Sequence, residues 1–121
     1  MKEIKRGEIY AVDFGTGFGS EQGGTRPSLI LQNDIGNRHS PTTIVAAITG
    51  RKTKAALPTH VKIMAKELKT ESTVLLEQIR TIDKARLGEY IGRLDSKTLA
   101  AVDRAIVVSL GIKYLEGLLN G

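Results

Sequence analysis

The sequence has 121 residues, no cysteine and a formal net charge of +5, and it fits one domain, residues 1–121, whose core needs neither disulfides nor thiolate metal sites. The charged N-terminal segment lacks the apolar stretch of a signal peptide, and the longest aliphatic run, 44–48, is far below the ~18 residues of a membrane span, so we expect a cytoplasmic protein without a membrane anchor. The positive charge favours a polyanionic partner such as nucleic acid, whereas two phenylalanines, three tyrosines and no tryptophan argue against a broad base-stacking sheet.

Short apolar segments, separated by turn-forming residues, fill most of the chain. The pattern predicts strands at 7–14, 27–32, 42–49, 60–63, 73–82 and 89–94. The third of these is apolar on both faces, which predicts a central position in the sheet. Glycine-rich residues 15–25 and turn formers at 33–41 connect the first three strands, 51–59 is a basic loop, and 83–87 predicts one helical turn.

A longer helix is predicted near the C-terminus. Asp95 or Ser96 is a suitable N-cap, and Gly111 is a natural stop. One apolar face is expected from residues at helical spacing, which are Leu99, Val102, Ile106 and Leu110. Many short strands followed by one helix predict a mostly β fold with short α elements (α+β), in which the helix packs against a small barrel. The apolar residues of the tail, 112–121, suggest packing on the body or on a partner.

The stretch GSEQGGTRP, residues 19–27, is either a mobile strand connection or a loop that holds an anionic ligand. The preceding GTGFGS does not open a helix and lacks a Gly-Lys-Ser/Thr sequence, so neither a dinucleotide fingerprint nor a P-loop is present. Glu21, Gln22 and Arg26 place an acceptor, an amide and a guanidinium together, a set that can read base edges and grip a phosphate. The alternative for Arg26 is a salt bridge with Glu21 or Glu77.

A hairpin between 27–32 and 42–49 would bring two polar residues together. If its centre lies between Asn37 and Arg38, Ser28 faces Ala47 and Arg26 faces Thr49, provided that the register does not slip by one residue. A guanidinium and a hydroxyl suit stabilisation of a phosphorane-like transition state, with the 2′-hydroxyl of RNA as the nucleophile. Because arginine stays protonated, it is a poor base, and the group that removes the 2′-hydroxyl proton stays open.

Other catalytic arrangements fit less well. A two-histidine mechanism would need His39, near the predicted turn, to meet His60, which begins another strand. A metal-dependent nuclease needs clustered carboxylates, and the acidic residues show no ligand spacing, so no metal site is expected. Glu77 and Gln78 lie on an apolar strand, where one of them points inward or into a groove. They are either polar side chains at the edge of the sheet or residues that contact a base.

Five stretches carry a family resemblance: KRGEIYAVDF, GSEQGGTRPSLILQND, NRHSPTTIVAAIT, LPTHVKI and VLLEQIRTIDKARL. Over roughly residues 4–110 the chain closely resembles the MazF/PemK toxins of type II toxin–antitoxin systems. The resemblance implies an SH3-like barrel of the MazF/CcdB type with a C-terminal helix, and a homodimer. It also implies metal-independent, cofactor-free cleavage of single-stranded RNA at a short motif, usually containing ACA, which leaves a 2′,3′-cyclic phosphate and a 5′-hydroxyl.

The same resemblance assigns roles to particular residues. Arg26, in GGxRP, matches the catalytic arginine, and Thr49, at the end of AAIT, matches the catalytic threonine. The positions implied to contact RNA are Ser20, Glu21, Gln22, Asn33, Glu77 and Gln78. A MazE-type antitoxin would block the RNA groove through a flexible acidic segment. Two alternatives remain: a CcdB-like inhibitor that binds DNA gyrase without nuclease activity, and a basic RNA-binding module without catalysis.

Overall fold

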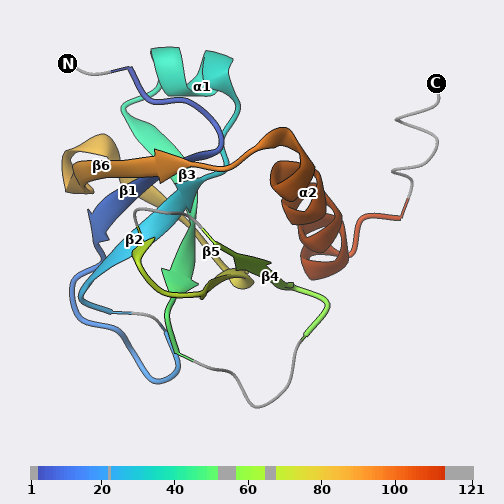
Figure 1. Cartoon of the computed structure of the whole chain (residues 1–121). Coiled ribbons are helices and arrows are strands. Elements are labelled where there is room, and N and C mark those ends of the chain that lie inside the picture. The colour runs from blue at the N-terminus through green and yellow to red at the C-terminus, as the bar shows by residue number, and fades with distance from the viewer. Residues whose placement is uncertain (1–2, 22, 52–56, 65–67, 114–121) are drawn as a thin grey trace.

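The computed structural model describes residues 3–21, 23–51, 57–64 and 68–113 (Figure 1). Strands dominate this part of the chain, and a single longer helix follows them, so the predicted mostly β class with short α elements is confirmed. No helix in the described ranges is long and apolar enough to cross a membrane. The elements, in chain order, are β1 (Glu8–Asp13), β2 (Thr25–Ile30), α1 (Asp34–His39), β3 (Thr42–Thr49), β4 (His60–Ile63), β5 (Ser72–Asp83), the 3₁₀ turn η2 (Lys84–Arg86), β6 (Leu87–Arg93) and α2 (Ser96–Leu110).

The strands form one antiparallel sheet of six strands in the order β4-β5-β3-β2-β1-β6. The apolar strand β3 lies inside the sheet, as its sequence predicts, because both of its faces are covered. The edges are β4 and β6. Helix α2 contacts β4 and β5, and Figure 1 shows it beside that end of the sheet.

The register of β2 on β3 confirms the predicted hairpin pairing, since Ser28 lies opposite Ala47. The connection between them is not the predicted turn but the short helix α1. The side chain of Asn33 caps this helix by accepting a hydrogen bond from the Gly36 amide at 2.8 Å. The connection between the last paired residues, Ile30 and Val45, is still centred between Asn37 and Arg38, so the two strands pair in the predicted register.

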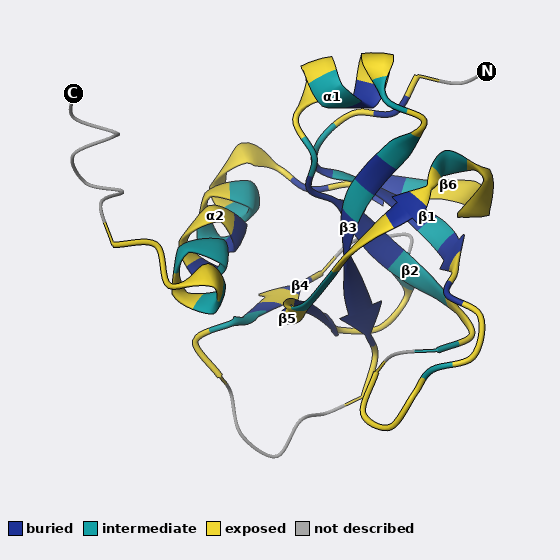
Figure 2. Ribbon diagram, turned by 180° about the vertical axis from the view of Figure 1, so that it is seen from behind, coloured by how far each residue is buried: buried dark blue, intermediate teal, exposed yellow. Residues whose placement is uncertain are grey.

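The two faces of the sheet bury different side chains, as the alternation along each strand requires (Figure 2). Ile9 and Leu29 belong to the cluster that packs with α2, whereas Tyr10 and Ile30, the next residues along the strands, belong to a second cluster. A sheet with apolar side chains on both faces needs cover on both. Helix α2 covers only the first.

Helix α2 begins and ends as predicted but turns a different face inward at its C-terminal end. Asp95 is the N-cap and accepts a hydrogen bond from the Thr98 amide at 2.7 Å, and Gly111 ends the helix at φ 65°. Val102 is buried, but Leu110 is 62% exposed, so the predicted burial of Leu110 is wrong. On this last turn it is Ser109 that faces the sheet, since its hydroxyl donates a hydrogen bond to the Leu76 carbonyl of β5 at 2.6 Å. The tail residues 114–121 lie outside the described residues.

Tyr10 gives a pH-dependent test of this packing. Burial, the charge of Glu8 and a 3.1 Å hydrogen bond to Glu8 together raise the pKa of Tyr10 to about 12. The neutral form is therefore favoured by folding, so its contribution to stability is complete below pH 10 and is lost between about pH 10 and 12. In a spectrophotometric titration of tyrosinate, we expect one late phase that Tyr10→Phe removes. Titration of Tyr10 at its ordinary value of 10.0 would contradict the buried position.

Candidate nucleic-acid interface

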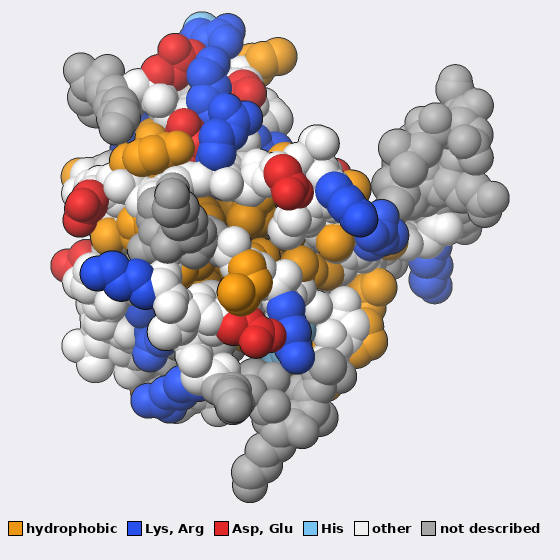
Figure 3. Space-filling view, viewed as in Figure 1, with side chains coloured by type: hydrophobic (Ala, Val, Ile, Leu, Met, Phe, Trp, Pro, Cys, Tyr) orange, Lys and Arg blue, Asp and Glu red, His pale blue; other side chains and the backbone are white. Residues whose placement is uncertain are grey.

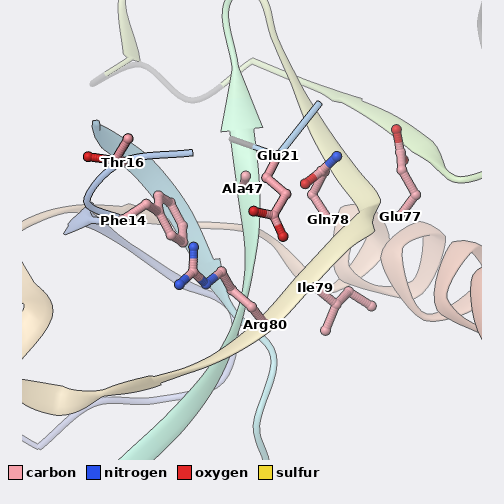
Figure 4. A pocket seen from close by; sticks show the side chains of 8 residues that line it. All are labelled: Phe14, Thr16, Glu21, Ala47, Glu77, Gln78, Ile79 and Arg80. Carbon is pink, nitrogen blue, oxygen red and sulfur yellow. The ribbon is translucent and has the colours of Figure 1, made fainter. Parts of the chain in front are cut away.

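A cavity of about 450 Å³ opens between the β1–β2 loop and the middle of β5 (Figure 4). Ala47 of β3 lies between these two walls. The remaining side chains come from two parts of the chain that are distant in sequence: Phe14, Thr16 and Glu21 from the first, and Glu77, Gln78, Ile79 and Arg80 from the second. The cavity thus combines carboxylates, an amide, a guanidinium and an aromatic ring, which suits a polar, partly aromatic ligand.

The glycine-rich loop is a defined structure rather than a loose connection. Its neck is closed by backbone hydrogen bonds from Phe14 to Gly24 at 3.0 Å and from Gly24 to Gly15 at 2.7 Å. A Cβ atom at Gly23 would lie 2.4 Å from the amide nitrogen of Gly17, so this close approach requires glycine. The loop therefore holds Glu21 at the wall of the cavity.

Glu21 is exposed but is held by a hydrogen bond within the loop. Its carboxylate accepts a hydrogen bond from the Phe18 amide at 3.1 Å, and Phe18 itself is 84% exposed. Ser20 is exposed, and its carbonyl oxygen has a long contact of 3.5 Å with the Gln78 amide. Gln22 lies outside the described residues. The loop thus faces β5 across the cavity.

Arg26 lies near the start of β2 and pairs with Val12 of β1. Its Nε donates a hydrogen bond to the Gly23 carbonyl at 2.9 Å, which ties the guanidinium to the glycine loop. Among the described residues it forms no salt bridge, so the alternative of an ion pair with Glu21 or Glu77 is not what the structure has. The terminal guanidinium nitrogens form no hydrogen bond within this part of the chain.

Thr49 ends β3, where it pairs with Thr73 and is 5% exposed. Its Oγ1 accepts a hydrogen bond from the Arg51 amide at 3.2 Å, which leaves the hydroxyl proton for another acceptor. The paired residues of β2 and β3 end at Ser28 and Ala47. Arg26 and Thr49 each lie two residues further toward the same end of the two strands. The two side chains therefore share one end of the strand pair, although the ladder itself does not extend to them.

Asn33 is placed apart from that end. It follows β2, whereas Arg26 is near the start of the same strand, and its side-chain oxygen is used to cap α1. Helix α1 and strand β4 are likewise separated in both ribbon views (Figures 1 and 2), so His39 and His60 do not form a pair. The structure thus groups Glu21, Glu77 and Gln78 around the cavity and leaves Asn33 elsewhere in the chain.

Strand β5 has a wide bulge where it faces the cavity. Ala46 pairs with Ile79 but Ala47 pairs with Leu75, so residues 76–78 have no partners on β3. Successive residues of a regular strand point to opposite faces, and a bulge relaxes this alternation. Glu77 and Gln78 can therefore both line the cavity, and Figure 4 shows them rising side by side from β5.

Two neighbours hold the Glu77 carboxylate. Thr59 donates a hydrogen bond to Oε1 at 3.0 Å, and His60 Nε2 lies 2.9 Å from Oε2. Burial alone would raise the pKa of Glu77, but the hydrogen bonds from His60, from its own backbone and from Thr59 outweigh burial and lower that pKa. Glu77 is thus an ionised acceptor at neutral pH.

Phe14 and Arg80 are two of the cavity residues that sequence reasoning did not assign to the site. The Arg80 guanidinium carbon lies 5.1 Å from the centroid of the Phe14 ring, within the range of a cation–π interaction. Arg80 follows Gln78 by two positions on the predicted strand, and this spacing was a signal that the two share a face. Phe14 gave no such signal, because it follows a strand that is not adjacent to β5.

The charges on the face shown in Figure 3 are not gathered in one patch. Basic side chains lie near α1, beside α2, near the centre and at the lower left, with acidic side chains between them. In the described ranges, no three His, Cys, Asp or Glu side chains are arranged so that they could hold a metal ion. The candidate interface is therefore defined by the cavity, the glycine-rich loop and Arg26.

Comparisons with a family model and with known proteins agree on one family. The model of PemK-like, MazF-like toxins of type II toxin–antitoxin systems matches residues 5–110. Endoribonuclease EndoA of Bacillus subtilis is 55% identical over 111 residues, which are 90% of this chain and 96% of that protein.

Solved structures agree with this family match. MazF from Deinococcus radiodurans superposes with a TM-score of 0.80 at 26% identity, covering 93% of this chain and 100% of that one. A mycobacterial endoribonuclease in complex with its cognate antitoxin has a TM-score of 0.76 at 28% identity, covering 91% of this chain and 97% of that one. The similarity thus extends over almost the whole fold.

Proposed function

The chain belongs to the PemK-like, MazF-like toxins of type II toxin–antitoxin systems, and from this we propose that it is the endoribonuclease of such a system. The observation that carries the proposal is the 55% identity, over 90% of the chain, with an endoribonuclease of Bacillus subtilis. The positions of Arg26, Thr49 and the polar cavity are consistent with that activity. The substrate is single-stranded RNA, cut at a short motif that we expect to contain ACA.

The proposed reaction is an attack by the RNA itself. The 2′-hydroxyl oxygen bonds to the adjacent phosphorus and its proton passes to a base. The bond from phosphorus to the 5′-oxygen breaks, and that oxygen takes up a proton. The products are a 2′,3′-cyclic phosphate and a 5′-hydroxyl, and no water is consumed in this step.

Arg26 and Thr49 are the proposed catalytic residues. Arg26 is held through Nε by Gly23, so its terminal nitrogens can donate two hydrogen bonds to the phosphoryl oxygens as negative charge develops there. The Thr49 hydroxyl, which accepts from the Arg51 amide, can donate a third. In the described part of the chain the Arg26 side chain hydrogen-bonds only to the Gly23 carbonyl, so no general base is found beside it there, and Arg26 itself is proposed to transfer protons in the transition state.

The proposed partners follow from the same family. We propose that the chain acts in the cytoplasm as a homodimer and that a MazE-type antitoxin neutralises it by covering the RNA groove. A mycobacterial relative and the Deinococcus radiodurans MazF have each been solved with their antitoxins. Ser20, Glu21, Gln22, Asn33, Glu77 and Gln78 are proposed to contact the RNA, Asn33 from a position remote from the cavity within one chain.

Sequencing of cleaved ends tests the proposal. Total RNA incubated with the purified protein should yield new 5′-hydroxyl ends that share one short motif. A gyrase inhibitor or a non-catalytic RNA-binding module would leave the RNA intact, and that result would reject the proposed function.

Chelation provides a second test. Because the proposed charge stabilisation comes from Arg26 and Thr49, excess EDTA should leave the cleavage rate within about twofold of the untreated rate. The measurement is the initial rate on a short RNA with one site, with a magnesium-dependent nuclease as the control for chelation. Loss of cleavage in EDTA that magnesium restores would contradict the metal-independent mechanism.

A further inference from the structure

His60 and Thr59 each hold one oxygen of the Glu77 carboxylate. The His60 side chain is 8% exposed, whereas that of Glu77 is 37% exposed, so a buried donor supports a carboxylate that still reaches solvent. The bulge that carries Glu77 is itself anchored, because the Leu76 amide donates to the Thr59 carbonyl at 2.9 Å and Ser109 of α2 donates to the Leu76 carbonyl at 2.6 Å.

The hydrogen-bond geometry fixes the role of each group. An ionised carboxylate only accepts hydrogen bonds, so His60 must carry a proton on Nε2. The other ring nitrogen, Nδ1, is buried and has no hydrogen-bond partner in the described part of the chain. The hydrogen bond to Glu77 is therefore the polar interaction that orients the His60 imidazole in this part of the chain. It directs the Nε2 proton of His60 toward Oε2 of Glu77.

The carboxylate retains acceptor capacity toward the cavity. A carboxylate has about four lone-pair positions, and Thr59 and His60 occupy one on each oxygen. Next to it, at the same end of the cavity, is the Gln78 amide, while Arg80 lies at the other end (Figure 4). A locked acceptor favours a ligand that presents N–H donors and disfavours one that presents carbonyl oxygens.

We propose that Glu77 determines specificity by accepting a hydrogen bond from the exocyclic amino group of one RNA base, and that His60 and Thr59 are the positioning residues that lock it as an acceptor. Adenine, cytosine and guanine carry such a group, whereas uracil has carbonyl oxygens in its place. This inference rests on the proposed RNA cleavage. It adds to that function a preference for bases that carry an exocyclic amino group. It also assigns a positioning role to Thr59 and His60, which do not touch the reacting atoms.

The test compares the cleavage motifs of variants on a random RNA library. One position of the wild-type motif should exclude uracil, and Glu77→Gln, whose amide can also donate, should raise the use of uracil there about tenfold. His60→Leu and Thr59→Val remove one donor each and should relax the same position. His60→Gln keeps a donor and should restore the preference. The matched control is His39→Ala, which changes the exposed histidine on α1.

Kinetics separate positioning from a merely structural effect. On a short RNA with one preferred site, His60→Leu should raise KM about tenfold and leave kcat within about twofold, because binding at the base and not the chemical step is altered. Thr59 is only partly buried, so Thr59→Val gives the same test if His60→Leu fails to fold.

The outcomes distinguish this inference from the function on which it rests. An unchanged motif in Glu77→Gln, or in both Thr59→Val and a folded His60→Leu, would overturn it while wild-type cleavage continued. A fall in kcat without a change in motif would also overturn it. Absence of RNA cleavage by the wild-type protein would reject the proposed function and this inference together.

Discussion

Replacement of Arg26 by alanine is expected to lower kcat for RNA cleavage by about 10²–10³-fold, the usual cost of removing one preorganised donor to a developing oxyanion. The guanidinium is tied to the loop through Gly23 and forms no salt bridge in the described ranges, so its charge is not needed for a structural ion pair. The measurement is the single-turnover rate on an RNA with one site, so that product release does not limit the rate.

Two further variants make this prediction specific. Arg26→Lys keeps the charge but cannot donate two parallel hydrogen bonds, so it should recover only part of the activity. Arg38→Ala removes an equally charged side chain from α1, where it contacts Glu3 at 3.5 Å, and should cleave at the wild-type rate. Thermal unfolding of all three variants controls for folding.

The same substitution separates the proposed nuclease from a protein-binding inhibitor. A toxin that acts by binding gyrase has no use for a phosphate clamp at Arg26. If Arg26→Ala were folded and fully toxic to growing cells, the inhibitor would be favoured. Loss of both toxicity and cleavage would support the nuclease.

Local sequence signals predicted the elements whose geometry depends on neighbours in the chain. The caps of α2, Asp95 and Gly111, act through hydrogen bonds within a few residues, and both are where the sequence places them. The register of β2 on β3 was also predictable, because the connection is centred between Asn37 and Arg38 whether it is a turn or a short helix. The turn formers at 33–41 misled because Asn and Asp favour helix caps as strongly as turns.

The candidate site was harder to predict, for a reason of geometry. The bulge at 76–78 exists only in relation to β3, so the residues of β5 alone do not reveal it. Phe14 follows β1, and two strands separate β1 from β5 in the sheet, so its contact with Arg80 depends on curvature of the whole sheet. Periodicity along a strand specifies which face a residue occupies but contains no information about that curvature.

A 2′-deoxy substitution at the cleavage site is expected to abolish cleavage and to leave binding within a few-fold. In the proposed reaction the 2′-hydroxyl is the nucleophile, and its removal leaves no internal group that can bond to phosphorus. The base edges and phosphates that the cavity and Arg26 would contact are unchanged by the substitution. The measurements are the single-turnover rate and the dissociation constant on the same short RNA.

The position of the substitution supplies the control for this last prediction. A 2′-deoxy nucleotide placed elsewhere in the same RNA should be tolerated, since only the hydroxyl next to the scissile phosphate reacts. Mass spectrometry of the wild-type product should give a 2′,3′-cyclic phosphate, one water lighter than the linear ester. Cleavage of the deoxy substrate would show that water attacks instead, and Arg26 and Thr49 would then have to stabilise a reaction that also needs a residue to activate that water.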